Sequence, residues 1–208
     1  NQKIYGKTHR LGDIEIVKQN MAEVARAKKR VGSSTQLVVG YHRYLGNHED
    51  ESAMNEYAHS LGYEMEPAWA YFMPLEKMLA YVGSDTTDVT VSEEDQKIID
   101  SLALPLPKAI EVAKSAPQQP CALRARQLSI TASGDVTLCC STFDQSKFKI
   151  GQYLDIPLNE LQAMRYRHNT CETCMNSGLH VLFMQNDEKF EDIASRGHGW
   201  MWSGDTIH

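Results

Sequence analysis

The segment that decides the fold is residues 13–70, which opens with DIEIVKQNMAEVARAKKRV (13–31) and continues through QLVVGYHRYL (36–45). The first stretch repeats apolar residues at helical spacing, and Asp13 and Gly32 supply the N-cap and the stop that such a helix needs. The second stretch starts with an unbroken apolar run, which predicts a strand buried on both faces.

A second helix and a second strand follow in the same order. Residues 50–61 have a helical pattern that ends at Gly62, and residues 63–70 form the next strand-like run. Helix, strand, helix, strand at this spacing is typical of parallel βαβ units. Further helices are predicted at residues 73–82 and after Ser92, which is followed by acidic residues. The sequence therefore predicts an α/β fold with parallel strands.

A proline-punctuated stretch, ALPLPKAIEVAKSAPQQP (103–120), marks a change of character. We expect it to separate two domains, residues 1–115 and 116–208. After it the chain alternates apolar and polar residues around the turn sequence at 133–135, which predicts a β-hairpin. A helix is predicted at 157–167. The second domain is therefore expected to be a small α+β unit with a C-terminal tail.

Composition excludes several classes of function. The chain has 208 residues, 21 basic against 27 acidic, and a formal net charge of −6, which gives no general reason to expect nucleic acid binding. No apolar run reaches the roughly 18 residues that a membrane-spanning helix needs. No charged-then-apolar leader follows Asn1. We expect a cytoplasmic protein without a membrane or nucleic acid partner.

All the cysteines lie after residue 120: they are Cys121, Cys139, Cys140, Cys171 and Cys174. An odd number of cysteines argues against a secreted disulfide framework. Cys171 and Cys174 form a CxxC, which in a turn lets both thiolates reach one metal centre, while Cys121 and Cys139 flank the predicted hairpin. Such a four-thiolate site accepts either structural zinc or an iron–sulfur cluster, and the spacing alone does not choose between them. Cysteines that bind no metal are the third alternative. A redox dithiol at the CxxC is a weaker alternative.

The spacing of these residues resembles the auxiliary-cluster region of radical SAM enzymes, called SPASM in its full form and twitch in its shortened form. Twelve residues separate Cys121 from Gly134, four separate Gly134 from Cys139, and the CxxC follows after a gap. The full form has another cysteine where this chain has His180. The resemblance therefore implies a twitch-like domain in which one auxiliary 4Fe–4S cluster is bound by Cys121, Cys139, Cys171 and Cys174.

The N-terminal part resembles the later half of the radical SAM partial barrel. The residues that occupy the family positions there are Asn47, Glu49, Ala58, Leu61 and Gly62. Together the two resemblances cover about residues 10–184. They imply the later half of a parallel partial (β/α) barrel followed by the small cluster-binding domain.

The defining CxxxCxxC of the family, which holds the cluster that cleaves S-adenosylmethionine, does not occur in this chain. The resemblance thus implies a partner, namely the N-terminal half of the barrel, on the same or a separate chain. It also implies an enzyme that uses radicals derived from S-adenosylmethionine on a peptide or small-molecule substrate. The alternative is a non-enzymatic binding module stabilised by zinc or an iron–sulfur cluster.

Four polar residues, Tyr41, His42, Arg43 and Asn47, lie at the end of the first predicted strand. Side chains at the carboxyl ends of barrel strands tend to line the active site. We therefore expect these residues to face the substrate or S-adenosylmethionine. The alternative is a solvated loop.

Cys140 is adjacent to a predicted ligand, and neighbouring strand residues face opposite ways, so it should point away from Cys139 and bind no metal. Two roles remain open for it. It is either a buried structural thiol or a catalytic donor of a hydrogen atom to a substrate radical, a role that resembles that of a cysteine in radical SAM peptide epimerases. His180 is expected to be a helix residue that faces the core or solvent.

Overall fold

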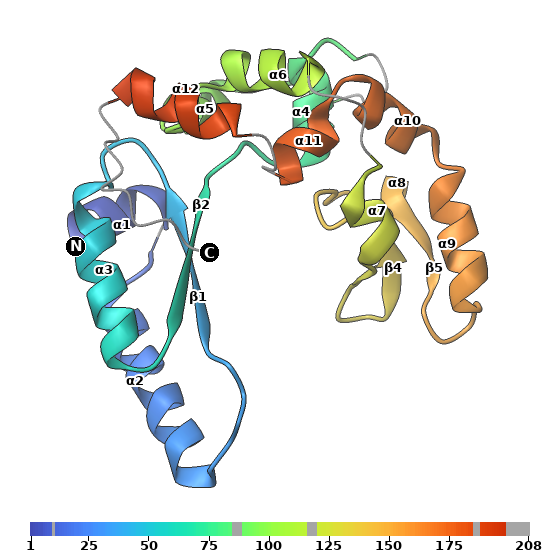
Figure 1. Ribbon diagram of the computed structural model, residues 1–208. Coiled ribbons are helices and arrows are strands. Elements are labelled where there is room, and N and C mark those ends of the chain that lie inside the picture. The colour runs from blue at the N-terminus through green and yellow to red at the C-terminus, as the bar shows by residue number, and fades with distance from the viewer. Residues whose placement is uncertain (10, 85–88, 116–119, 185–187, 199–208) are drawn as a thin grey trace. The chain divides into compact units, whose positions relative to one another are not determined.

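A computed structural model describes residues 1–9, 11–84, 89–115, 120–184 and 188–198 (Figure 1). Within these residues the chain is a mixed α/β protein with twelve helices, a two-stranded parallel sheet and a three-stranded antiparallel sheet. Two compact units divide the chain: an N-terminal unit, residues 1–70, and a C-terminal unit, residues 71–208. The boundary predicted after residue 115 lies inside the C-terminal unit. No helix in the described ranges is long and apolar enough to cross a bilayer.

The N-terminal unit alternates helices and strands, as the sequence predicts. Its elements are α1 (Gln2–Thr8), α2 (Ile14–Val31), β1 (Val38–Arg43), α3 (Glu49–Ser60) and β2 (Glu64–Trp69). The ends of α2 are the predicted ones. The Asp13 carboxylate accepts hydrogen bonds from the first helical N–H groups, and Gly32 closes the helix in the left-handed conformation, with φ +63°.

β1 and β2 are parallel and in register from Val38 opposite Glu64 to Arg43 opposite Trp69. The prediction of parallel βαβ pairing is confirmed. The prediction that β1 is buried on both faces is wrong, because its residues alternate and Val38 is 43% exposed. Figure 1 shows α2 and α3 on one side of the strands. In the described residues this parallel sheet has two strands and forms no barrel.

Both long helices of the N-terminal unit pack on the same face of the sheet. Their shared core centres on Met21, Ala58, Tyr63 and Met65, with partly buried apolar side chains around it. The Tyr63 hydroxyl donates to the carbonyl of Met21 at 3.1 Å, which satisfies its polar group inside the core. The Tyr57 hydroxyl likewise donates to the carbonyl of Lys18, at 2.9 Å. This unit is therefore stabilised mainly by an apolar interface between helices and sheet.

The C-terminal unit begins with α4 (Leu75–Tyr81), α5 (Glu93–Asp100) and α6 (Leu106–Ser115). Ser92 and Asp95 form the capping box that starts α5, and Lys77 donates from α4 to the buried Asp95 at 2.5 Å. The stretch predicted to be a boundary contains α6 instead. Pro105 precedes the helix and Pro107 lies in its first turn, where the missing N–H is tolerated, and the other two prolines follow the helix in the sequence. α6 packs against two later helices, α11 (Leu179–Met184) and α12 (Lys189–His198).

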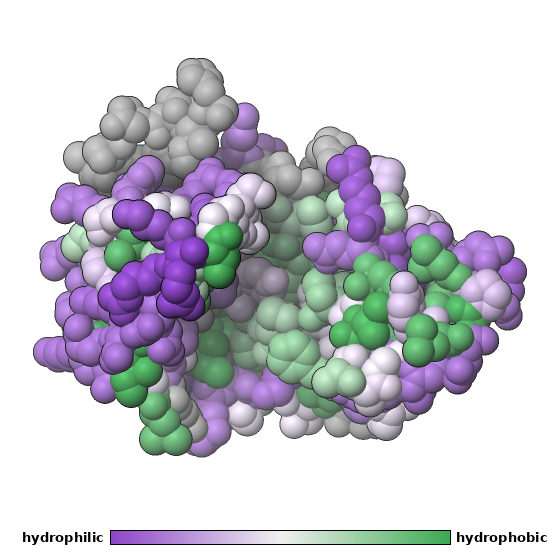
Figure 2. Space-filling view, turned by 90° about the horizontal axis from the view of Figure 1, so that it is seen from below, coloured by the Kyte–Doolittle hydropathy of each residue, from purple (hydrophilic) through white to green (hydrophobic). Residues whose placement is uncertain are grey.

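Short elements make up the rest of this unit. They are α7 (Ala122–Arg126), β3 (Ser129–Ile130), β4 (Asp135–Thr137), α8 (Gln145–Phe148), β5 (Lys149–Gln152), α9 (Leu158–Tyr166) and α10 (Asn169–Asn176). β4 pairs antiparallel with both β3 and β5, so the predicted hairpin is confirmed. The predicted helix at 157–167 is α9. Leu154, between β5 and α9, and Leu158, the first residue of α9, are exposed. Figure 2 shows apolar residues on the surface of the molecule among the polar ones.

Gly178 allows the close approach of the α10–α11 turn to α6. It lies in the turn between α10 and α11 with φ +73°, a conformation that favours glycine. A Cβ added there would lie 2.6 Å from the carbonyl oxygen of Ala113 in α6, closer than such atoms can come. The absence of a side chain at this residue therefore allows α6 to lie close to the turn between α10 and α11.

Candidate functional site

The four predicted ligand cysteines come from three segments of the C-terminal unit. Cys121 is the residue that precedes α7, at its N-cap. Cys139 follows β4 and begins a turn, in which the N–H of Thr142 donates to the Cys139 carbonyl at 3.2 Å. Cys171 and Cys174 both lie on α10. The expectation that the CxxC forms a turn is wrong: it is helical, and the spacing of three residues places both thiols on one face of the helix.

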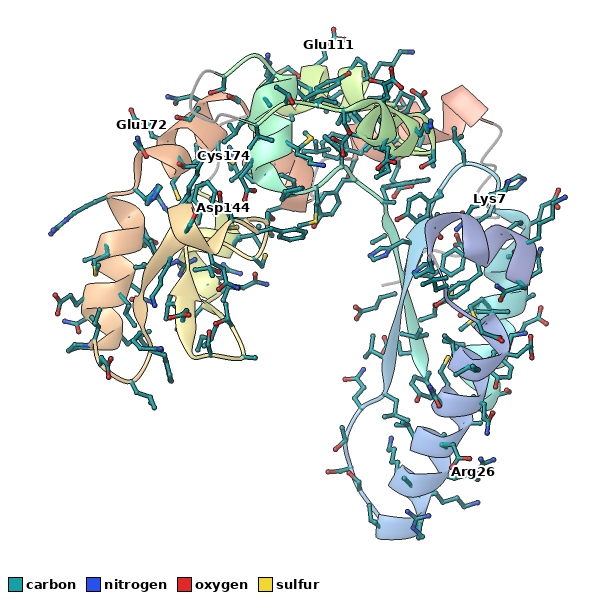
Figure 3. The ribbon with its side chains drawn as sticks, turned by 180° about the vertical axis from the view of Figure 1, so that it is seen from behind. Lys7, Arg26, Glu111, Asp144, Glu172 and Cys174 are labelled. Atoms are coloured by element: carbon teal, nitrogen blue, oxygen red, sulfur yellow. The ribbon has the colours of Figure 1, made fainter. Side chains whose placement is uncertain are left out.

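The side chains of all four cysteines line a single cavity. We call it the cysteine cavity; its wall is completed by Leu75, Arg124, Leu138, Met175 and His180. Figure 3 labels two neighbouring positions of α10 that show its orientation, Glu172 and Cys174. Glu172 is exposed, whereas Cys174 is buried and turned into the unit. Cysteines from residue 121 to residue 174 are thus brought together by the fold.

Burial governs the chemistry of these thiols. It raises the pKa of Cys174, and the nearby thiols of Cys121, Cys139 and Cys171 raise it further, because each thiolate disfavours charge on its neighbours. Burial also raises the pKa of Cys171, although the Arg124 guanidinium opposes this effect. Four thiolates in this cavity would repel one another strongly. A bound cation or cationic cluster is what allows thiols in such an arrangement to ionise together.

Backbone N–H groups also point at these sulfurs. The N–H of Ser141 donates to the Cys139 sulfur at 3.5 Å, and the N–H of His180 donates to the Cys174 sulfur. Such donors favour the thiolate, which is the form that binds metals. The His180 side chain is buried in α11, so its predicted placement in a helix facing the core is confirmed. Sequence reasoning missed that it forms part of the cavity wall.

Cys140 lies next to the cavity but not in its wall. Since β4 ends at Thr137, the strand alternation used to orient Cys140 does not apply; the residue lies in a turn and is exposed. The expectation of a buried structural thiol is therefore wrong. A hydrogen bond between Cys140 and Cys139 lowers the pKa of Cys140 and raises that of Cys139. Gln127 is a second neighbour of the Cys140 thiol, at 3.6 Å.

A buried arginine ties the cysteine-bearing segments together. Arg165, on α9, is 1% exposed, and its guanidinium donates to three backbone carbonyls: Leu138 at 3.0 Å, Gln127 at 2.6 Å and Leu123 at 3.2 Å. Leu123 lies on α7, after Cys121, and Leu138 immediately precedes Cys139. Arg165 therefore fixes the two segments that carry the first two cysteines relative to each other.

A buried carboxylate holds the loop that follows Cys139. The Glu76 carboxylate, on α4, accepts from the N–H groups of Phe143 and Asp144, both at 2.8 Å. The N–H of Leu75 donates to the carbonyl of Ser141 at 2.7 Å. These bonds attach α4 to the loop that follows Cys139, and they bring Leu75 into the cavity wall.

Sequence reasoning missed Arg165, Glu76 and Arg124. The sequence does contain an indication that Arg165 is buried: it lies four residues after the buried Leu161 and so shares its helix face. No sequence pattern indicated the role of Glu76, because its partners are backbone N–H groups more than sixty residues away. Arg124 was missed because α7 itself, only five residues long, was not predicted.

Among the residues predicted to face substrate or S-adenosylmethionine, three are engaged within the N-terminal unit. The Tyr41 hydroxyl donates to the Asn47 carbonyl at 2.6 Å. Arg43 is 2% exposed and forms a two-pronged ion pair with Glu51, at 2.7 and 2.8 Å. The Asn47 side chain donates to the carbonyl of His42 at 2.8 Å. These contacts fold the loop between β1 and α3 onto the strand.

His42 differs from these neighbours. Its side chain is exposed, on the face of β1 opposite the buried Arg43. Arg43 itself lies over the Trp69 ring of β2, 4.9 Å from its centroid. Of the four predicted residues, His42 is thus the one whose side chain lies on the open face of the sheet.

Comparison with protein-family models, with curated proteins and with solved structures found no match to this chain.

Proposed function

We propose that this chain is a portion of a radical SAM enzyme whose C-terminal unit binds one auxiliary 4Fe–4S cluster through Cys121, Cys139, Cys171 and Cys174. The observation that carries the proposal is the cysteine cavity. The four residues were chosen from sequence spacing alone, and all four line the same cavity. Cys140, the one cysteine left out, does not line it.

The donor set suits an iron–sulfur cluster. All four cysteines line one cavity, and four-cysteine ligation is typical of 4Fe–4S clusters, although no group of three or more histidine, cysteine or acidic side chains in the described part of the chain is arranged to hold a metal ion. Backbone N–H groups of Ser141 and His180 are directed at two of the four sulfurs.

Full ligation by four cysteines leaves no iron free for a substrate. The cluster supplies one-electron chemistry when bound. The chain's own residues then hold its position: Arg165 and Glu76 fix the segments on which Cys121 and Cys139 lie, and α10 presents the other two thiols. A reducing cytoplasm would keep these cysteines available for metal binding.

The second part of the proposal concerns the N-terminal unit. Its parallel βαβ arrangement is the repeating unit of a (β/α) barrel. We propose that strands of the missing N-terminal half, on the same or a separate chain, complete a partial barrel that binds S-adenosylmethionine and a peptide or small-molecule substrate. His42 on the open sheet face is the residue of this unit best placed to meet them.

Anaerobic purification and reconstitution with iron and sulfide test the cluster. We expect a brown protein with about four iron atoms per chain, the content of one 4Fe–4S cluster. Cys174→Ala should abolish the colour, and Cys140→Ala, the matched control, should retain it. A colourless wild-type protein with about one tightly bound zinc would contradict the proposal and support the zinc-stabilised binding module.

A further inference from the structure

Arg124 brings a permanent positive charge into the wall of the cysteine cavity. It lies on α7, three residues after Cys121, and its side chain is half-buried. It lines the cavity together with Cys171, and its positive charge opposes the burial that raises the pKa of the Cys171 thiol. Among the described residues it forms no ion pair with a carboxylate. Because an arginine stays protonated in proteins, this charge is present at every working pH.

Tyr166 holds the guanidinium in place. The charged end of Arg124 lies over the Tyr166 ring, 4.2 Å from its centroid. Tyr166 is the last residue of α9 and follows Arg165, which is fixed by its three bonds to backbone carbonyls. The ring therefore follows a residue that is held in place, and it orients the Arg124 guanidinium.

We propose that Arg124 is the positioning residue that sets the reduction potential of the group bound in the cysteine cavity. This inference rests on the proposed cluster. A group held by four thiolates gains one negative charge when a one-electron reductant reduces it, and neither a proton nor a ligand moves. A nearby fixed cation stabilises that extra charge. Arg124 supplies this cation from the wall that it shares with Cys171.

The test is a spectroelectrochemical titration of the reconstituted full chain, with dithionite as reductant and mediator dyes. Arg124→Gln should make the cluster harder to reduce by at least about tenfold, which corresponds to a potential roughly 59 mV more negative. Arg124→Lys keeps the charge and should recover most of the shift. Tyr166→Leu, which removes the ring that orients Arg124, should produce a smaller shift in the same direction.

Arg126 provides the matched control. It lies two residues further along α7, is exposed, and does not line the cavity. Arg126→Gln removes the same charge from the same helix and should leave the potential unchanged. Equal shifts in Arg124→Gln and Arg126→Gln would show a general charge effect and overturn the inference, as would an unchanged potential in Arg124→Gln.

Iron content separates the remaining outcomes. If Arg124→Gln loses iron while Arg126→Gln retains it, Arg124 acts in cluster retention, and its proposed control of the potential is wrong. A wild-type chain that binds no cluster under reconstitution would overturn the proposed function and this inference together. A brown wild-type protein with an unshifted Arg124→Gln variant would overturn this inference alone.

Discussion

The N-terminal unit packs an 18-residue helix and a 12-residue helix against two six-residue strands, whereas the cysteine-bearing part of the C-terminal unit is built from elements of two to nine residues. In the first unit an apolar interface around Met21 and Tyr63 holds the elements together. In the second, the segments from α7 to α10 are joined by buried polar side chains, Arg165 and Glu76, and converge on four thiols.

This difference shows how buried polar side chains can supplement apolar packing between short elements. A two-residue strand such as β3 buries little surface, so hydrophobic burial alone stabilises it weakly. Charged side chains that satisfy several backbone groups at once add specific connections. Metal ligation adds a further connection between segments, and the free energy of metal binding then contributes to the free energy of folding. The predictions below test whether the two units depend on these different sources of stability.

The largest effect is expected from Cys174→Ala. Removing one of four ligands should release the bound metal, and the segments from residue 120 to 176 should lose their fixed arrangement. Limited proteolysis with mass spectrometry should show new cleavage in that range and an unchanged pattern within residues 1–70. A chelator applied to the wild-type protein should reproduce the result. New cleavage in both units alike would contradict the contrast drawn here.

Arg165→Met should have the next largest effect. The substitution leaves the carbonyls of Leu123, Gln127 and Leu138 without their buried donor, and each unsatisfied group costs about 1–3 kcal/mol. We expect the free energy of unfolding of the C-terminal unit to fall by roughly 3–5 kcal/mol in urea denaturation, with loss of metal affinity. Arg167→Met is the control, because Arg167 is exposed on the same helix end, and it should change stability by less than about 0.5 kcal/mol.

Met21→Ala addresses the N-terminal unit. Met21 is 8% exposed and packs in the core beside Ala58 and Tyr63, so its truncation removes buried apolar surface and leaves a cavity. We expect a loss of about 2 kcal/mol in the stability of this unit. The loss should be the same with and without chelator. A loss that depends on metal would show that the stabilities of the two units are coupled.

The sequence predicted most of the N-terminal unit because its signals are local. Periodicity, the Asp13 cap and Gly32 located α2, and the strand rhythm located β1 and β2. The burial of β1 was predicted wrongly, because an apolar run does not reveal that one face of a two-stranded sheet stays open. In the C-terminal unit, α6 was missed because its prolines were interpreted as a boundary, although a helix tolerates proline in its first turn.

The candidate site shows the same limit. Cysteine spacing was enough to predict the four residues that line the cavity, because cysteine is rare and its spacing is distinctive. The contacts that hold the site depend on distant backbone groups, which leave no pattern in the sequence. Arg165 meets carbonyls 27 to 42 residues away. Tyr41, Arg43 and Asn47 could be located at the end of a strand, but their hydrogen-bond partners could not.

Cys140→Ala should have the smallest effect, and it is the sharpest check on the site. Cys140 is exposed and its nearest polar contacts are Cys139 and Gln127, so its removal should change stability by less than about 0.5 kcal/mol. Iron content and visible absorbance should stay at the wild-type level, whereas Cys139→Ala should lose both. The pair is well matched because the two thiols are adjacent and hydrogen-bonded to each other.

If Cys140 donates a hydrogen atom to a substrate radical, the complete enzyme with Cys140→Ala should still cleave S-adenosylmethionine and fail to form product. If the thiol has no such role, product formation should continue at a similar rate. Loss of iron in Cys140→Ala with retention in Cys139→Ala would exchange the roles of the two residues. The cavity would then take its fourth thiol from Cys140, which is exposed in this structure, so the turn that carries Cys139 and Cys140 would have to rearrange.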